Sequence, residues 1–442
     1  MVACKTLNGQ IDSPELHGLF CRLFVPDKYL GHRQSRRHNL FAPPLARSVA
    51  RAESPVCRTL MMLNALLTAD PECDVFADEW KKEIPYHSVK GDTGSLLVAP
   101  ELVPAVDTIA SFEGLTTKIV IDDYSEIIQD EKSSPLRKEG FSWTAYYDVD
   151  SIYGYLQNVS QQNSNWTQLV VAGKSYEGRQ IVGLRINTPT AVDKPVMFIE
   201  SGIHAREWIT PATTTYFINE LMTSQDPEIA ALRDSFDWHI FPTVNPDGYH
   251  YSFTRDRMWR KTRSRSSNGC YGADPNRNWD YNWMDYGASK NPCNYQTYGG
   301  HSPFSEVETR TLAAYISGLE NMLGYVAFHA DAQMLLLPYS DSTEHTANYD
   351  DLKQIGETSL KYGYAVNKAK YEGPGTAAEL LYKASGGSMD WVRHAHGTPL
   401  VYTYELRGRY FHWPPSRIHE QGDEVTQMLL GLATEARNLG YY

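Results

Sequence analysis

The chain has 442 residues, of which 42% are hydrophobic and 12% aromatic, a composition typical of a globular protein large enough for more than one domain. Its formal net charge is -12, which argues against the clustered Lys and Arg that a nucleic-acid-binding surface needs. No apolar run reaches the roughly 18 residues of a membrane span. We therefore expect neither nucleic acid nor membrane as a partner.

Residues 1–73 form a leader that we assign to no folded unit. Its first 58 residues hold nine Lys or Arg and four Asp or Glu, a net charge of +5. Such a basic stretch is typical of a disordered or transit-like arm, or of an upstream extension that does not belong to the folded protein. No secretory signal peptide is recognisable at its start.

Residues 74–138 are expected to form a small α+β unit that ends in a linker. A strand is predicted at 95–99, a helix at 100–111 and a second strand at 118–121. Residues 129–140 are charged, contain Pro and Gly and lack apolar periodicity, which is typical of a linker. The dibasic pair Arg137 and Lys138 would make this linker a target for a trypsin-like protease.

Helices and strands alternate from residue 139 onward. Helices are predicted at 148–156, 211–222, 305–317, 352–362 and 423–438, and strands at 168–172, 180–186, 195–200, 239–244, 325–329 and 400–406. Strands that are apolar almost throughout, alternating with amphipathic helices, indicate a sheet covered on both faces. We expect residues 139–442 to form one large α/β/α domain with a mixed central sheet.

His204 and Glu207 are three residues apart and can offer an imidazole nitrogen and a carboxylate oxygen to one metal ion. Catalytic zinc sites use three protein ligands and leave the fourth position to water. His329, at the end of an apolar strand, is the candidate for the third ligand. Asp274 could orient a ligand imidazole through a hydrogen bond. The spacing alone is weak evidence, because about one His-x-x-Glu is expected by chance in such a chain.

A metal-dependent hydrolase also needs a base, a cation for the developing oxyanion and a group that binds the substrate. Glu405, at the end of a strand, is a candidate base. Arg257 and Arg260 could place two guanidinium groups on one face of a helix or turn. Asn276 and Arg277 offer donors suited to a carboxylate. Each of these residues also has an ordinary interpretation as a solvated surface group.

Cys270 and Cys293 bracket 22 residues rich in Asn, Tyr and Gly, so a disulfide that closes a long surface loop is plausible. Glycosylation sequons occur at 158–160 and 165–167. Together these features favour a secreted, extracellular protein.

Six segments carry a resemblance to a known family over nearly all of the chain after residue 74. They are His204-Ala-Arg-Glu-Trp208, Asn245-Pro-Asp-Gly-Tyr249, Arg257-Met-Trp-Arg-Lys-Thr-Arg263, Asp274-Pro-Asn-Arg-Asn-Trp-Asp280, Tyr382-Lys-Ala-Ser-Gly-Gly-Ser388 and Tyr404-Glu-Leu-Arg407. In this order they resemble the zinc metallocarboxypeptidases of the pancreatic carboxypeptidase A/B type.

The resemblance implies a zinc-dependent exopeptidase that cleaves the C-terminal peptide bond of peptides and proteins. His204, Glu207 and His329 would hold one Zn²⁺ ion, Glu405 would be the general base, and Arg260 would stabilise the oxyanion. The terminal carboxylate of the substrate would be held by Asn276, Arg277 and Tyr382. Arg206 and Arg257 would contact substrate along its approach, and Asp274 would support His204.

The same resemblance assigns Met389 to the floor of the pocket for the C-terminal side chain, where an acidic residue would select Lys or Arg. Ala377, Ala384, Gly387 and Thr403 are the expected wall positions. A flexible, apolar Met predicts A-type specificity, the removal of aliphatic or aromatic residues.

The chain departs from the family pattern in three places. Ala330 and Asp331 follow His329 where the family usually has Ser-Tyr; the Asp331 carboxylate would either favour a basic penultimate substrate residue or face solvent. The loop after Glu405 is about two residues shorter, so the aromatic that lines the cleft is either Phe411 or absent.

The third departure is that residues 74–131 resemble only the latter half of the family's inhibitory pro-segment. We still expect a zymogen that a trypsin-like protease cleaves near Arg137 and Lys138, releasing the carboxypeptidase domain 139–442. A monomer is expected. The competing hypotheses are a metal-dependent deacylase of N-acyl amino acids and a noncatalytic binding protein on the same fold.

Overall fold

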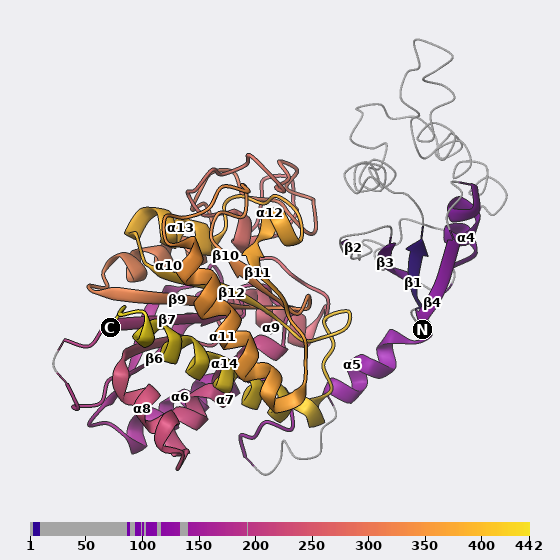
Figure 1. Ribbon diagram of the computed structural model, residues 1–442. Helices are drawn as coiled ribbons and strands as arrows, with labels where there is room; N and C mark the ends of the chain where they lie inside the picture. Colours follow the sequence, from indigo (N-terminus) through magenta and orange to yellow (C-terminus); the bar gives the residue numbers. More distant parts are fainter. Residues whose placement is uncertain are drawn as a thin grey trace. The chain divides into compact units, whose positions relative to one another are not determined.

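The computed structural model describes residues 3–8, 86–88, 93–98, 100, 103–112, 116–132, 140–191 and 193–442 (Figure 1). The chain divides into two compact units, Met1–Glu126 and Ile127–Tyr442. Within the described part of the chain, no helix has the length and apolar character needed to cross a membrane.

The first unit contains a four-stranded sheet in the order β2-β3-β1-β4. Its elements are β1 (Ala3–Asn8), β2 (Tyr86–Ser88), β3 (Thr93–Val98), α4 (Val103–Phe112) and β4 (Thr116–Ile121). The predicted strands and helix are present, with ends shifted by a few residues. β1 falls within the leader and was not predicted, although it pairs antiparallel with both β3 and β4.

Helix α5 (Tyr124–Lys132) corrects part of the predicted linker, because residues 129–132 are helical. The helix has Glu126 in its first turn and Lys132 in its last, which suits the helix dipole. Its low apolar content hid it from a periodicity argument. The dibasic pair Arg137 and Lys138 lies outside the described residues.

The second unit is built on an eight-stranded sheet in the order β11-β10-β12-β9-β7-β8-β6-β5. Its strands are β5 (Thr167–Lys174), β6 (Gln180–Ile186), β7 (Val196–Ser201), β8 (Asp237–Phe241), β9 (Met322–Ala330), β10 (Met334–Leu337), β11 (Glu372–Thr376) and β12 (Leu400–Leu406). The central neighbours β12, β9, β7 and β8 are parallel, whereas β5–β6, β6–β8 and β10–β12 are antiparallel. The predicted mixed sheet is confirmed.

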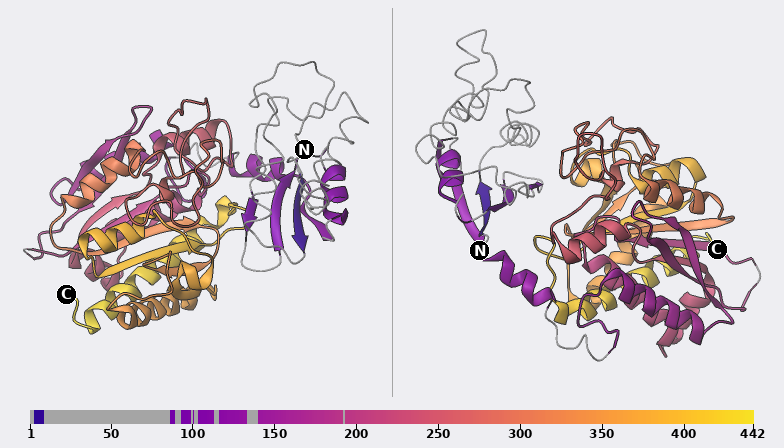
Figure 2. Two further views of the ribbon diagram at one scale, coloured as in Figure 1. Left: turned by 90° about the horizontal axis from the view of Figure 1, so that it is seen from above. Right: turned by 180° about the vertical axis from the view of Figure 1, so that it is seen from behind.

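Helices cover both faces of this sheet (Figure 2). One face carries α6 (Val149–Gln162), α7 (Ile209–Thr223), α8 (Pro227–Ser235), α11 (Tyr349–Asn367) and α14 (Ile418–Asn438), and the other carries α10 (Val307–Ser317), α12 (Ala377–Leu380) and α13 (Ser388–His396). Alternate residues of one strand enter different cores: Met197 and Ile199 of β7 join the first, and Phe198 joins the second. The predicted α/β/α domain is therefore confirmed.

The carboxyl ends of the parallel strands position the polar residues. β7 ends three residues before His204, His329 is the penultimate residue of β9, and Glu405 is the penultimate residue of β12. Because these strands run in the same direction, their polar ends meet at one edge of the sheet, which is where ligands bind in sheets of this kind.

Candidate metal centre

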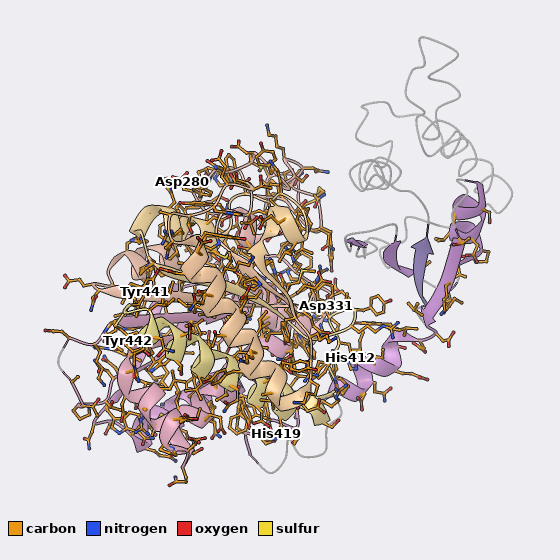
Figure 3. The ribbon with its side chains drawn as sticks, in the orientation of Figure 1. Asp280, Asp331, His412, His419, Tyr441 and Tyr442 are labelled. Carbon is orange, nitrogen blue, oxygen red and sulfur yellow. A yellow bond between two sulfur atoms is a disulfide. The ribbon has the colours of Figure 1, made fainter. Side chains whose placement is uncertain are left out.

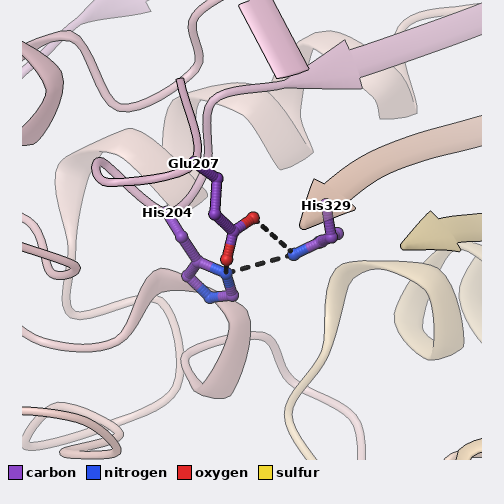
Figure 4. Close-up of side chains that lie close together, drawn as sticks. All are labelled: His204, Glu207 and His329. Carbon is purple, nitrogen blue, oxygen red and sulfur yellow. Dashed lines mark hydrogen bonds and ion pairs between the residues drawn. The ribbon is translucent and has the colours of Figure 1, made fainter. Parts of the chain in front are cut away.

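The three predicted ligands lie together in the second unit (Figure 4). The Nδ1 atom of His204 is 2.9 Å from Oε1 of Glu207 and 3.1 Å from Nδ1 of His329. The same His329 nitrogen is 3.4 Å from Oε2 of Glu207. All three residues are almost fully buried, with at most 3% of each exposed. One metal ion could therefore be bound by all three side chains.

Asp274 determines which nitrogen of His204 faces the other two predicted ligands. Nε2 of His204 donates to Oδ1 of Asp274 at 3.1 Å, so the lone pair of Nδ1 is directed at Glu207 and His329. Oδ2 of Asp274 accepts hydrogen bonds from Nε and Nη2 of Arg260 at 3.1 and 2.8 Å. Burial alone would raise the pKa of Asp274, but Arg260 and His204 hold it well below its usual range.

The donor set fits a zinc ion. Two imidazole nitrogens and one carboxylate oxygen are ligands that zinc prefers, and the two ring nitrogens face each other at 3.1 Å, where either a proton or a metal ion can lie between them. Burial would lower the pKa of His329, but the Glu207 carboxylate raises it to about 9. The side chains alone thus create a site that attracts a cation, and a metal ion would displace the proton held there.

The loop that carries His204 is fixed by backbone contacts. Gly202 has a φ of +66, and a Cβ there would lie 3.0 Å from a backbone carbonyl, so the turn directly after β7 favours glycine. Asn245 donates to the carbonyl of Ile203 at 3.0 Å. The backbone N–H of Ala205 donates to the carbonyl of Arg260 at 3.1 Å. The ligand loop and the segment of Arg260 therefore hold each other in place.

Glu405 and Arg260 lie beside the ligands. Glu405 of β12 is the register partner of His329 of β9. Burial raises the pKa of Glu405 to about 7, a value suited to a group that takes up and returns a proton near neutral pH. Nη1 of Arg260 is 3.8 Å from Oε1 of Glu207, which places a cation at the edge of the metal centre.

Asn276, Arg277 and Tyr382 are brought together on one side of the centre. Arg277 is 4% exposed, its Nε donates to the carbonyl of Gly287 at 3.0 Å, and its Nη2 donates to the Tyr382 hydroxyl at 3.4 Å. Tyr382 itself is 49% exposed. The Oδ1 atom of Asn276 accepts from the backbone N–H of Ser388 at 3.0 Å. A fixed guanidinium and an exposed phenol could both donate to a carboxylate.

Met389 follows Ser388 and is buried against β12. The Thr403 hydroxyl lies 3.3 Å from Sδ of Met389. Thr403 and Glu405 are two residues apart on β12, so their side chains lie on the same face of the sheet. Met389 packs against this face, which also carries the proposed base. Ala377, Ala384 and Thr403 are buried, and Gly387 lies against Asn276.

A second group of residues lies around Phe411. The guanidinium of Arg206 stacks on the Phe411 ring at 3.9 Å, and Oδ2 of Asp331 accepts from the Phe411 backbone N–H at 2.8 Å. The Asp331 carboxylate is thus turned toward the loop that holds Phe411 and His412, and Figure 3 shows Asp331 and His412 on the same side of the second unit. Burial and Arg260 lower the pKa of Arg206 to about 10.

Arg257 has a partner that no sequence pattern predicts. Its Nε and Nη2 donate to the two carboxylate oxygens of Glu131 at 2.6 and 2.9 Å. Nδ1 of His412 lies 2.9 Å from Oε1 of the same carboxylate. Glu131 is fully buried. The charged stretch around Glu131 lacks apolar periodicity, so nothing in it would have singled out this residue.

Cys270 and Cys293 form a disulfide, with 5.2 Å between their Cα atoms. The crosslink closes a loop that contains Asp274, the residue that holds His204 in place. Nζ of Lys261 also donates to the carbonyl of Asn294 at 2.7 Å. The disulfide predicted from the cysteine spacing is present.

An α/β/α domain with a buried two-His, one-Glu centre at its strand ends defines the class of zinc-dependent hydrolases. The chain belongs to the zinc carboxypeptidase family, whose model matches residues 152–428. The His-Glu-His centre corresponds to the zinc site of that family, and the expected Zn²⁺ cofactor is thereby confirmed.

Individual relatives cover most of the chain. It is 44% identical over 306 residues to the zinc carboxypeptidase of Simulium vittatum, which spans 67% of this chain and 98% of the relative. It is 39% identical over 289 residues to carboxypeptidase B of Astacus astacus, with 64% and 94% covered. The crystal structure of carboxypeptidase A from Helicoverpa armigera is similar with a TM-score of 0.73 at 29% identity, covering 86% and 96%. Both A and B types are thus among the relatives.

Proposed function

We propose that this carboxypeptidase removes aliphatic or aromatic residues from the C-termini of peptides and proteins. The observation that carries the choice is Met389, an apolar side chain against Thr403 where an acidic side chain would select Lys or Arg. A buried carboxylate would be needed to offset the cost of burying a substrate cation. Met389 offers instead an adaptable apolar surface.

The proposed roles of the side chains follow from their positions. Zinc held by His204, Glu207 and His329 would supply a Lewis acid that polarises a carbonyl and acidifies water. Glu405 takes the proton of the attacking water and returns it to the departing amine. Arg260 offers its guanidinium to the charge that grows on the carbonyl oxygen.

Recognition of the free C-terminus is assigned to Arg277, Asn276 and Tyr382. The guanidinium of Arg277 is fixed by the carbonyl of Gly287, and the Tyr382 hydroxyl already lies 3.4 Å from it. A charged terminal carboxylate matches these donors, whereas an internal peptide bond carries no charge at this position. This difference accounts for cleavage at the end of a chain rather than within it.

The test compares peptides that are identical except for a C-terminal Phe, Leu or Lys. We expect kcat/KM for Phe and Leu to exceed that for Lys by at least about 100-fold, because a cation in an apolar pocket loses its hydration. A clear preference for Lys would refute the specificity.

We further propose that the chain is a secreted zymogen, with a pro-segment at 74–138 and an enzyme domain at 139–442. The Glu131 carboxylate occupies Arg257, one of the residues assigned to the approach of substrate. A trypsin-like protease that cuts at Arg137 and Lys138 would separate Glu131 from the enzyme domain. Limited trypsin digestion should yield a stable fragment of about 300 residues with raised activity; unchanged activity after complete cleavage would remove the latency proposal.

A further inference from the structure

The contact between Glu131 and Arg257 has the form of a binding site with its ligand in place. Two parallel hydrogen bonds, of 2.6 and 2.9 Å, join the guanidinium to both carboxylate oxygens. His412 adds a third contact at 2.9 Å. The carboxylate is fully buried, and Arg257 is 4% exposed. Burial raises the pKa of Glu131, but Arg257 and His412 outweigh this effect, so the group is held as an anion.

The guanidinium is held in position by contacts other than Glu131. Its Nη1 donates to the carbonyl of Arg206 at 2.6 Å, and its Nη2 donates to the carbonyl of Phe411 at 2.7 Å. Its plane lies over the ring of Trp208, with 4.0 Å from Cζ to the ring centroid. The receiving side of the contact is therefore built entirely from the enzyme domain and is preorganised for a planar carboxylate.

Glu131 lies before the proposed cleavage site in the chain, whereas Arg257 and His412 lie after it. If the chain is cut at Arg137 and Lys138, the carboxylate leaves with the pro-segment and its receptor stays behind. The guanidinium, still held by the carbonyls of Arg206 and Phe411, then lacks its anion. An anion of the same shape is then the ligand that best restores the lost interactions.

We propose that the activated enzyme binds a carboxylate of its substrate at Arg257 and His412, in the place that Glu131 occupies before cleavage. The ligand is the side chain of an Asp or Glu upstream of the scissile bond. Arg206 and Phe411, which contact Arg257 through their carbonyls, connect this subsite to the metal centre. The inference rests on the proposed function, because it requires the cleavage and a peptide substrate.

The experiment uses full-length chain cleaved by trypsin, freed of its pro-segment and carrying Glu405→Gln to prevent turnover. Calorimetry measures its affinity for peptides that are blocked at the N-terminus and end in a Phe with a free carboxylate. Each peptide contains one Glu, placed second, third or fourth from the C-terminus. Each peptide is paired with one that has Gln at the same place. We expect Glu to bind about tenfold more tightly than Gln at one of these places. Equal affinities at all three places would overturn the inference.

Variants locate the effect. Arg257→Lys keeps a charge but loses the paired donors, and His412→Gln loses one contact; both should reduce the ratio of the affinities for the Glu and Gln peptides. His301→Gln, at an exposed position, is the matched control and should retain the full preference. If the Glu preference is undiminished in Arg257→Lys, the carboxylate binds at another site. Because binding is measured without turnover, failure of the proposed activity in the parent enzyme leaves this result interpretable.

Discussion

Glu405 and His329 are direct register partners on the adjacent parallel strands β12 and β9. The hydrogen-bonded ladder between the strands therefore holds a proposed base beside a metal ligand, although 76 residues separate them in the sequence. Sites built on strands are positioned more accurately than sites built on loops. His204 and Glu207, which do lie on a loop, are instead fixed by Asn245 and by the backbone of Arg260.

Glu405→Gln should abolish turnover and retain the metal. The amide cannot take up a proton, so we expect kcat to fall by about 10²–10⁴-fold. Glu405 is not one of the three clustered ligands, so elemental analysis should still find one zinc per chain. Retention of more than a tenth of the activity would exclude Glu405 as the base.

Asp274→Asn should weaken zinc binding without removing a ligand. The amide can no longer accept the Nε2 proton of His204 as a charged partner, and it also releases Arg260. Loss of such a supporting carboxylate typically costs about 10–100-fold in metal affinity. Competition with a chromophoric chelator measures the change. An affinity equal to that of the parent protein would mean that Asp274 serves Arg260 alone.

The architecture and the ligand set could be predicted from the sequence because both produce local sequence patterns. Alternating apolar strands and helices indicated the α/β/α domain, and the His-x-x-Glu motif with a strand-end His indicated the centre. The structure adds the pairing of β12 with β9, which no local pattern specifies. β11 was missed because its sequence, Glu-Gly-Pro-Gly-Thr, is rich in residues that are rare in strands, and β10 because a four-residue apolar run cannot be assigned by periodicity alone.

Glu131 shows why the remaining part of the site could not be predicted. Its segment is charged and polar, and its partners Arg257 and His412 are more than 120 residues away. Burial of a carboxylate is favourable only when such partners are in place. A pairing between distant charges leaves no periodic signal, so the helix that carries Glu131 was interpreted as a linker.

Met389→Asp should move specificity toward basic C-terminal residues. The new carboxylate would lie beside Thr403 in an otherwise apolar setting and could pair with a substrate Lys or Arg. We expect the ratio of kcat/KM for Lys over Phe to rise by at least about 100-fold. Met389→Leu conserves volume and charge and should keep the parent preference. If both variants behave alike, Met389 does not line the pocket.

Glu131→Gln should make the uncleaved chain more active. The neutral amide leaves Arg257 buried without its anion, and breaking a buried pair in this way costs about 3–5 kcal/mol. The end of α5 should then dissociate more often, raising activity before cleavage by about tenfold or more. Glu126→Gln changes an exposed residue of the same helix and is the matched control. After complete trypsin cleavage, the parent chain, Glu131→Gln and Glu126→Gln should have the same activity.

The Glu131 contact should also be sensitive to acid. Its folded-state pKa is lowered, because Arg257 and His412 outweigh the effect of burial. A lowered pKa means that the stabilisation is complete above the ordinary Glu value of about 4.3 and is lost as the pH falls through the lowered folded value. Hydrogen exchange of residues 127–132 should therefore show protection at pH 6 that disappears in strong acid. Glu131→Gln should show weak protection at both pH values; protection equal to that of the parent chain would mean that neighbouring contacts, rather than the ionised carboxylate, hold this segment.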